Sequence, residues 1–270
     1  MNAPALLSLR LSVGYPGKPG VLRNVALEMC RGEILGLVGQ SGCGKSTLAL
    51  AILRLLHLKN GRAEGSIQLQ NRDLMTLSER EMRTLRGREI GLVLQSPMSS
   101  LNPALRIGTQ LEEAWKVHRN GGHDQCRKEI LQALENVSLP AEENLLRRYP
   151  SQLSVGQAQR VLIAMATLHH PSLLIADEAT SALDLITQAE ILEQFRDLSS
   201  KFGMGILYIS HDLLSVATIS QRVAVMHAGE IVECRETAEI FRSPRHPYTQ
   251  QLIRALPVVP QFAAAGAVKS

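Results

Sequence analysis

The sequence predicts an α/β fold in which a mostly parallel sheet carries an inserted group of helices. Apolar strands alternate with helical segments around a glycine-rich loop at 39–46, which indicates parallel strands joined by crossover helices. Residues 104–148 show only the helical spacing of apolar side chains, which indicates an all-helical insertion. Two alternating segments, 6–13 and 21–29, flank a turn at 15–20 and predict an antiparallel β region at the N-terminus.

The remaining elements follow in order along the chain. The apolar run 34–38 predicts a buried strand before the glycine-rich loop, and 47–56 predicts a helix after it. Next come a turn at 61–65, a half-exposed strand at 66–70, a charged helix at 78–86 and a strand at 89–95 that ends at Gln95. After the insertion we expect a strand at 172–176, a helix at 185–201, a strand at 205–210 and a hairpin at 223–233 turning at Ala228-Gly229.

Length and composition exclude several classes of protein. The 270 residues, 45% of them hydrophobic, suffice for one domain with an insertion or for two small lobes. The net charge of +4 is scattered and aromatic residues make up only 3%, so nucleic-acid binding is not expected. Four cysteines without a C-x-x-C pair predict a reducing compartment and no zinc or iron–sulfur framework. Neither a secretory signal nor an apolar run of about 18 residues is present, so any membrane role is peripheral.

The glycine-rich loop fits the phosphate-binding pattern G-x-x-x-x-G-K-S/T between a strand and a helix. Its residues are Gly39, Gln40, Ser41, Gly42, Cys43, Gly44, Lys45 and Ser46. The glycines let successive N–H groups point at one anion beside the positive end of the following helix. Lys45 adds a charge for the β- and γ-phosphates, and the Ser46 hydroxyl can ligate Mg²⁺. The alternative is a glycine-rich turn before a core helix, but the strand, the Lys-Ser pair and the helix together favour a phosphate site.

Two carboxylates end the later apolar strand at 172–176. A buried parallel strand would bring Asp177 to the mouth of the phosphate loop, where it can hold Mg²⁺ directly or through water. Glu178 points elsewhere and is placed to polarise a water for attack on the γ-phosphate. The alternative for this pair alone is an ordinary strand end.

A second helix start carries Ser154 and Gly156 before the helical run 158–168. A serine at this position is an N-cap, which is the alternative without further function. The same helix end would also bind an anion. Two anion sites in one chain indicate either two ligands or one ligand shared between two copies.

The segment Leu153–Gln157, followed by Gln159-Arg160, resembles the LSGGQxQR signature of ATP-binding-cassette (ABC) ATPases. The other motifs of that family follow the same order as in this chain: phosphate loop, Gln95, signature, Asp177-Glu178, Ser181–Asp184 and His211. The resemblance covers residues 5–255 and implies a P-loop NTPase (RecA-like) core with ATP and Mg²⁺ as cofactors. It also implies a head-to-tail dimer in which ATP lies between one copy's phosphate loop and the other copy's signature.

The resemblance assigns expected roles residue by residue. Glu178 would be the general base, His211 would contact the γ-phosphate, and Gln95 would contact Mg²⁺ or the lytic water, with Ser46 and Asp177 completing the metal site. The other nucleotide-binding residues would be Tyr15 on adenine, Thr47 with the loop around the phosphates, Ser154, Gly156 and Gln157 on the opposite γ-phosphate, and Asp184 linking the two sites. The alternatives are a turn residue for Tyr15, a strand cap for Gln95 and a core histidine for His211.

Three positions bear on activity. Val155 replaces the first glycine of the signature and Ala179 replaces a proline common after the general base, yet neither change removes a donor or the base. Cys43 lies in the phosphate loop at a helix N-terminus, where its pKa is expected to fall. Alkylation of Cys43 is therefore expected to block ATP binding, and ATP is expected to protect it.

The tail 241–253, with its His246-Pro247-Tyr248-Thr249 segment, resembles the extension of the peptide/nickel importer subfamily, as does 99–103. No cysteine follows Cys234, so no iron–sulfur cluster is expected. The short tail leans towards a nickel or metallophore importer, although a truncated peptide-importer ATPase fits as well. The resemblance implies a second, different ATPase subunit, two transmembrane permease subunits and a periplasmic binding protein, at the cytoplasmic face of the bacterial inner membrane.

The expected organisation is one ABC ATPase domain over 1–255, with its core at 1–98 and 166–235 and a helical subdomain at 99–165. A short C-terminal extension covers 236–270. A soluble ABC ATPase of translation or DNA repair would need a tandem cassette or a long coiled-coil insertion, and residues 104–148 are too short for the latter. A P-loop kinase would not need the second anion site at 153–157.

Overall fold

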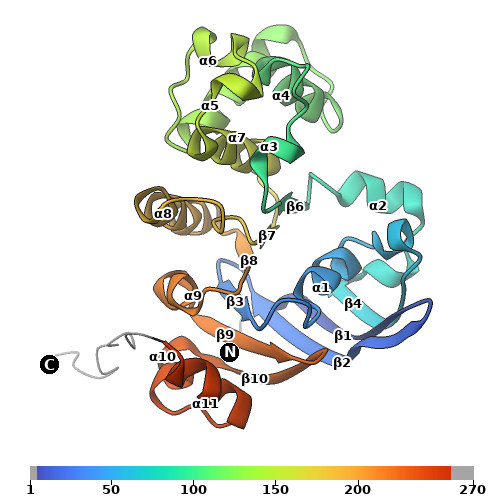
Figure 1. Ribbon diagram of the computed structural model, residues 1–270. Coiled ribbons are helices and arrows are strands. Elements are labelled where there is room, and N and C mark those ends of the chain that lie inside the picture. Colours follow the sequence, from blue (N-terminus) through green and yellow to red (C-terminus); the bar gives the residue numbers. More distant parts are fainter. Residues whose placement is uncertain (1–4, 257–270) are drawn as a thin grey trace, which may run out of the picture.

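A computed structural model describes residues 5–256 and confirms the predicted α/β class (Figure 1). Two sheets form the body, and a separate group of helices stands to one side of it. The six-stranded sheet has the order β10-β9-β3-β8-β7-β6, and the four-stranded sheet has the order β2-β1-β4-β5. Among residues 5–256, no helix is long and apolar enough to cross a membrane.

The four-stranded sheet is antiparallel and contains the predicted N-terminal hairpin. Its strands are β1 (Ala5–Tyr15), β2 (Lys18–Cys30), β4 (Arg62–Leu69) and β5 (Arg72–Asp73). The predicted turns were too long: only Pro16-Gly17 separates β1 from β2, and β4 runs through 62–65. Gly65 belongs to the strand because a Cβ there would lie 2.1 Å from the Arg10 carbonyl oxygen of β1. The glycine marked a close approach of two strands rather than a turn.

The six-stranded sheet is parallel except at one edge. Its strands are β3 (Ile34–Val38), β6 (Ile90–Val93), β7 (Leu173–Asp177), β8 (Gly205–Ser210), β9 (Arg222–His227) and β10 (Glu230–Glu236). Only β9 and β10 pair antiparallel, as the hairpin predicted at Ala228-Gly229. The strand β6 ends at Val93, so Gln95 lies two residues beyond it rather than at its last position.

Alternate residues of the parallel strands face two cores. On one face, Leu35 and Leu37 of β3 pack with the N-terminal sheet and with α1 (Lys45–Ile52). On the other face, Ile34 and Val38 pack with α8 (Leu185–Phe202), α9 (Leu213–Ile219) and the helical group. Burial on both faces explains why these strands are continuous apolar runs. The short segments between the sheets are η1 (Leu56–Lys59), η2 (Leu74–Thr76) and α2 (Glu79–Leu85).

The helical group forms the top of the molecule in Figure 1. It comprises α3 (Pro97–Ser100), α4 (Ile107–Lys116), α5 (His123–Glu135), α6 (Glu143–Arg147), η3 (Pro150–Gln152) and α7 (Val155–Thr167). Most of the apolar residues whose spacing predicted helices, including Leu111, Trp115 and Ile130, are at most 1% exposed, and Leu131 is half-buried. They form one hydrophobic core with the adjacent face of the sheet.

The described part of the C-terminal extension consists of α10 (Thr237–Arg242) and α11 (Pro247–Arg254). Both helices lie beside β9 and β10 at the bottom of Figure 1. Pro247 occupies the first turn of α11 and the His246 side chain caps it, which is why the helix begins there. Residues 257–270 of the predicted extension lie outside the described residues.

Candidate active site

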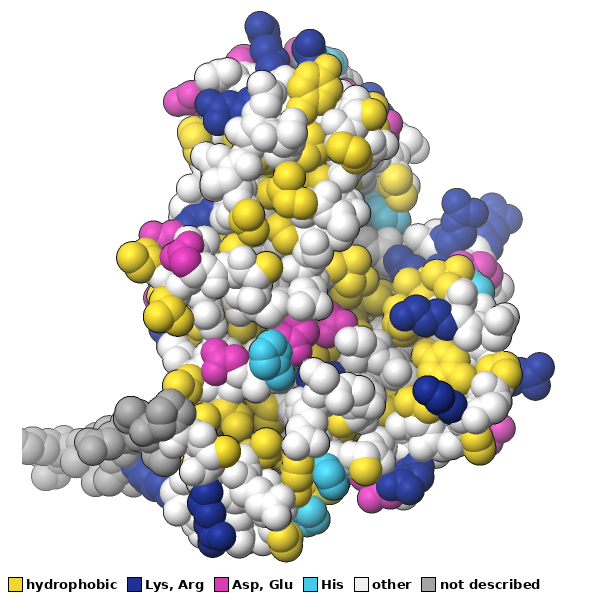
Figure 2. Space-filling view, viewed as in Figure 1, with side chains coloured by type: hydrophobic (Ala, Val, Ile, Leu, Met, Phe, Trp, Pro, Cys, Tyr) yellow, Lys and Arg dark blue, Asp and Glu magenta, His cyan; other side chains and the backbone are white. Residues whose placement is uncertain are grey.

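The sheet brings the predicted chemical groups to one edge. Val93 of β6 pairs with Ala176, Asp177 pairs with Ile209 of β8, and Ser210 pairs with Val38 of β3. The carboxyl ends of four parallel strands are therefore level, and the residues that follow them are neighbours. Figure 2 shows acidic and histidine side chains gathered at this level, where the helical group meets the body. Ligands of open parallel sheets bind at such an edge.

The phosphate loop curls between β3 and α1 as the pattern predicted. Gly42 and Gly44 have φ values of +81° and +116°, a region that side chains other than glycine rarely adopt. A Cβ at Gly44 would lie 2.5 Å from Cδ2 of Leu22, and one at Gly39 would lie 2.2 Å from the Met226 carbonyl oxygen. The glycines thus allow the loop to curl and to pack closely against β2 and β9.

Lys45 lies inside the loop and is only 6% exposed. Its Nζ donates to the carbonyl oxygens of Gly39 at 2.7 Å and Gln40 at 3.3 Å, and lies 4.0 Å from Oε1 of Glu178. The ammonium group is therefore held over the loop by backbone oxygens and one carboxylate. This arrangement presents a positive charge to any phosphate that enters the loop.

Asp177 and Ser46 fit a magnesium ion. Burial raises the pKa of the Asp177 carboxyl, while a hydrogen bond from the Ser46 hydroxyl opposes that rise. Among residues 5–256, Oδ1 of Asp177 is buried and has no hydrogen-bond partner. A hydroxyl and a carboxylate with a free buried oxygen are ligands that Mg²⁺ accepts, usually together with phosphate oxygens and waters. Asp177 and Ser46 could therefore hold the ion that accompanies a nucleotide.

Glu178 and His211 are in direct contact. Nδ1 of His211 and Oε2 of Glu178 are 2.7 Å apart, and the Glu178 side chain is 14% exposed while that of His211 is 56% exposed. Glu178 has a φ of +53°, and its N–H donates to the Ile209 carbonyl oxygen at 2.9 Å. The left-handed backbone turns the carboxylate away from Asp177 and towards Lys45 and His211. Its oxygens could accept a proton from a water at the mouth of the loop.

Gln95 lies on the exposed segment between β6 and α3, at the same sheet edge. Its backbone follows the strand that neighbours β7, which places it on the side of the site occupied by Asp177 and Glu178. The segment from Leu94 to Met98 connects the sheet edge to the helical group. Gln95 is thus positioned between the candidate metal site and the helices.

The second predicted anion site is the start of α7. The Ser154 Oγ accepts from the Gln157 N–H at 3.1 Å, and Gln157 Oε1 accepts from the Ser154 N–H at 3.1 Å, so the two residues form a capping box. A Cβ at Gly156 would lie 2.7 Å from Cγ2 of Thr187. Within residues 5–256, neither Ser154 nor Gln157 bonds to the phosphate loop. Among the described residues, this helix end is therefore not hydrogen-bonded to the chain's own phosphate site.

Asp184 caps α8 next to that helix end. Its Oδ1 accepts from the N–H groups of Ile186 and Thr187, and its Oδ2 accepts from the Thr187 hydroxyl. These hydrogen bonds, led by those from Thr187, lower the pKa of the Asp184 carboxyl. The next two side chains, Leu185 and Ile186, are 83% and 75% exposed, which leaves apolar surface beside Ser154 and Gly156.

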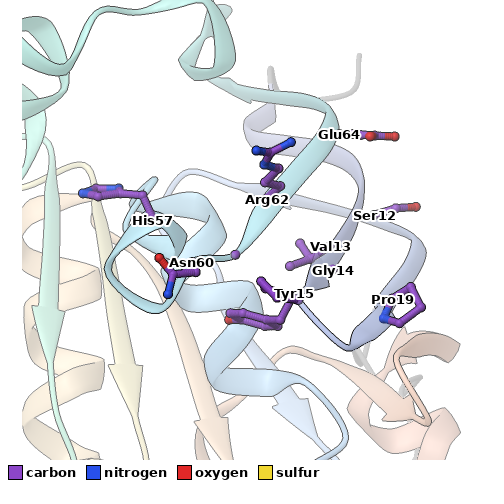
Figure 3. A pocket seen from close by; sticks show the side chains of 12 residues that line it. Ser12, Val13, Gly14, Tyr15, Pro19, His57, Asn60, Arg62 and Glu64 are labelled. Carbon is purple, nitrogen blue, oxygen red and sulfur yellow. The ribbon is translucent and has the colours of Figure 1, made fainter.

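Tyr15 lines a pocket of about 940 Å³ between the β1–β2 hairpin and the segment before β4 (Figure 3). Its ring covers Gly61, where a Cβ would lie 2.6 Å from Cε1 of the tyrosine. His57, Asn60 and Arg62 line the same pocket. No residue lining it belongs to the phosphate loop, so the structure does not itself join Tyr15 to the phosphate site. Stacking of adenine on Tyr15 stays a prediction.

The expected fall in the pKa of Cys43 is wrong. The thiol is only 8% exposed, and burial raises its pKa more than Lys45 and the neighbouring backbone N–H groups lower it. The side chain points to the packed side of the loop, where a Cβ at Gly39 would meet Sγ at 2.8 Å. Its position at a helix N-terminus alone suggested a reactive thiolate, whereas its direction could not be read from the sequence.

Two contacts of the loop were not predicted. The Tyr248 hydroxyl of α11 accepts from the Gln40 N–H at 3.1 Å, and the Gly229 N–H donates to the Cys43 carbonyl oxygen at 3.1 Å. The segment around Tyr248 had been singled out only as part of a family-like tail. Both contacts come from residues far from the loop in sequence, and no local sequence pattern predicts them.

The fold and the site define a P-loop ATPase: a curled glycine loop with its lysine, a half-buried aspartate and a following glutamate lie at the edge of a parallel sheet. Comparisons with known proteins identify the family. A model described as "ABC transporter" matches residues 22–181, and one described as "Oligopeptide/dipeptide transporter, C-terminal region" matches residues 232–266.

Two relatives and one solved structure illustrate the similarity. The oligopeptide transport ATP-binding protein OppD of Bacillus subtilis is 43% identical over 246 residues, which are 91% of this chain and 69% of that protein. The dipeptide transport ATP-binding protein DppD of Haemophilus influenzae is 43% identical over 94% of this chain and 78% of its own length. The ATP-binding cassette MJ0796, solved as a dimer in a post-hydrolysis state bound to ADP and phosphate, superposes with a TM-score of 0.72 at 28% identity, covering 86% of this chain and 98% of that one.

The chain belongs to the ABC transporter family and is an ATPase that binds ATP with Mg²⁺. The sequence resemblance to this family, including the peptide-transporter type of C-terminal region, is confirmed.

Proposed function

We propose that the chain is the ATP-hydrolysing subunit of an importer that takes up short peptides. The observation that carries this proposal is the peptide-transporter C-terminal region at 232–266, together with relatives named for oligopeptide and dipeptide transport. Uptake of nickel or a metal chelate is the second candidate and forms one arm of the test below. A soluble, non-transport ABC ATPase is not favoured by these relatives.

The proposed motor is a head-to-tail dimer with two shared ATP sites. At the start of α7, Ser154 is exposed and Gly156 is half-buried. Among residues 5–256, neither Ser154 nor Gln157 is hydrogen-bonded to the chain's own phosphate loop, so this helix end could bind the γ-phosphate on another copy. The exposed Leu185 and Ile186 beside it supply apolar area for such a contact. The similar cassette MJ0796, which is a dimer when bound to ADP and phosphate, supports the pairing of two cassettes. ATP would join the two copies, and hydrolysis would release them.

In each proposed site the residues divide the chemistry. Lys45 and the loop N–H groups hold the phosphates, and Ser46, Asp177 and Gln95 surround Mg²⁺. Glu178 takes a proton from the attacking water, and His211, hydrogen-bonded to it, is near enough to orient the carboxylate or contact the γ-phosphate. The remaining proposed contacts are Tyr15 with adenine, Thr47 with the phosphates, Gln157 with the opposite phosphate and Asp184 between the two sites.

The proposed partners are a second ATPase subunit, two transmembrane permease subunits and a periplasmic substrate-binding protein, with this chain at the cytoplasmic face of the inner membrane. Gln95 lies between the metal site and the helical group, so that group is the proposed route from ATP to the permease. The proposed division remains a core at 1–98 and 166–235, a helical subdomain at 99–165 and an extension from 236.

The test is the ATPase rate of the assembled transporter in lipid vesicles. The complex would combine this chain with the second ATPase subunit, the two permease subunits and the binding protein proposed above. Binding protein loaded with short peptides should stimulate hydrolysis, and binding protein loaded with a nickel chelate should not. Stimulation by the nickel chelate alone would contradict the proposed substrate, and lack of assembly with any permease would contradict the importer itself.

A further inference from the structure

The C-terminal extension reaches the phosphate loop through one side chain. Tyr248 of α11 is 7% exposed, and its hydroxyl accepts a hydrogen bond of 3.1 Å from the Gln40 N–H. Its ring stacks on His227, the last residue of β9, with the ring centroids 3.9 Å apart and an interplanar angle of 28°. The stack leaves the tyrosine ring little freedom, so the hydroxyl is presented to the loop in one position.

The bonded N–H belongs to a peptide unit that is held from both ends. The carbonyl of the same unit is that of Gly39, and it accepts from Lys45 Nζ at 2.7 Å. In a trans peptide the N–H and C=O point to opposite sides, so Tyr248 and Lys45 fix the plane of this unit between them. The carbonyl of Gln40 also accepts from Lys45 Nζ, at 3.3 Å. The orientation of this one peptide therefore sets where the ammonium group rests.

The extension is anchored firmly enough to act as a support. Glu233 of β10 is 8% exposed, and its carboxylate accepts from the N–H groups of Arg245 and His246 at 3.0–3.2 Å. Burial alone would raise the pKa of Glu233, but these hydrogen bonds outweigh it and the pKa is lowered. Nη1 of Arg235 also lies 3.4 Å from Oε1 of Glu233. The start of α11 is thus tied to the strand that pairs with β9, whose Met226 carbonyl contacts the loop at Gly39.

We propose that Tyr248 is a positioning residue for ATP binding, which holds the Gly39–Gln40 peptide so that Lys45 is aimed at the phosphates. The extension is then part of the nucleotide site rather than only a tail added to the cassette. Without the hydroxyl, the Gln40 N–H bonds to water, and the Gly39–Gln40 peptide and Lys45 gain alternative orientations. ATP binding must then restrict these orientations, which costs free energy. ATP affinity falls, while proton transfer by Glu178 is little changed because its shortest contact is with His211, at 2.7 Å, and its distance to Lys45 is 4.0 Å.

The test compares Tyr248→Phe with wild-type protein as the full chain. The substitution keeps the ring and its stack on His227 and removes only the hydroxyl. Both the Kd and the KM for ATP should rise about three- to tenfold, because the loss of one neutral hydrogen bond has an effect of that size. The value of kcat should change by less than about twofold. The matched control is Gln250→Ala on the same helix. In the described part of the chain, Gln250 Nε2 bonds to the carbonyls of Pro244 and Arg245 and not to the loop.

Melting temperatures without nucleotide separate this role from a merely structural one. If Tyr248 only fastens the extension, both variants lower the melting temperature and neither changes the Kd for ATP. Equal ATP affinity in Tyr248→Phe and wild type, or equal loss in Gln250→Ala, would overturn the proposal. Amide hydrogen exchange of wild-type protein gives a check that needs no variant: the Gln40 amide should be protected although its residue is exposed, and free exchange at that amide would also overturn it.

Discussion

Replacing Glu178 with glutamine removes one charge and almost no volume from the centre of the site. The carboxylate lies 4.0 Å from Lys45 Nζ and 2.7 Å from His211 Nδ1. As the proposed general base, Glu178 should contribute about 10²- to 10⁴-fold to the rate of hydrolysis. We therefore expect Glu178→Gln to lower kcat by that factor in the assembled transporter.

ATP should bind more tightly to the Glu178→Gln protein than to the wild type. Two unit charges 4.0 Å apart attract by about 4 kcal/mol at an effective dielectric of about 20. Lys45 keeps its two carbonyl partners, so only part of that attraction becomes available to the phosphates. We expect about 1 kcal/mol, or roughly fivefold tighter ATP binding.

Single-turnover hydrolysis and equilibrium ATP binding measure the two effects separately. The matched control is Glu79→Gln, because Glu79 pairs with Arg86 on α2, away from the strand ends. That control should hydrolyse and bind ATP as the wild type does. Hydrolysis by Glu178→Gln at the wild-type rate would refute the role of the base, and weakened ATP binding would refute the electrostatic reasoning.

Three further predictions concern the loop and its surroundings. Gly44→Ala should lose ATP binding and destabilise the fold by about 1–3 kcal/mol in thermal denaturation, because its Cβ would lie 2.5 Å from Leu22 at a φ of +116°; an unchanged melting temperature would contradict this. Burial raises the pKa of Asp177, so this group stabilises the nucleotide-free fold at acid pH and that contribution is lost as the pH rises through the raised pKa. Asp177→Asn should then melt higher than wild type near neutral pH but not in acid, and should lose Mg²⁺-dependent hydrolysis; a lower melting temperature at neutral pH would speak against a buried carboxylate. Because burial raises the pKa of Cys43, its alkylation should be slow at neutral pH and faster at higher pH, and ATP should slow it further. Mass spectrometry measures the alkylation, and rapid modification at neutral pH would show that the thiol is exposed.

Local sequence patterns predicted the parts of the site that lie on one strand and the turn after it. The phosphate loop, the Asp177-Glu178 strand end and the Ser154 cap each depend on residues adjacent in sequence. Parallel pairing then requires Val38, Asp177 and Ser210 to end together, so the class of fold already implied that these segments meet.

Long-range contacts explain what the sequence did not predict. Tyr248 and Gln40 are 208 residues apart, and no periodicity relates them. The direction of the Cys43 side chain depends on how tightly β9 packs on the loop, and Gly65 lies in a strand because β1 approaches it closely. A glycine or a thiol has several structural uses, and only its neighbours in space decide among them.

The central claim is that ATP held by the phosphate loop of one copy is completed by the start of α7 on another. Light scattering of Glu178→Gln protein with ATP, alone and mixed with its partner ATPase subunit, measures this most directly. The account predicts that ATP doubles the particle mass and that adding Ser154→Arg abolishes the doubling. The matched control, Ser200→Arg at an exposed position near the C-terminal end of α8, should leave the doubling unchanged. Absence of pairing with either partner, or pairing that survives Ser154→Arg, would contradict it.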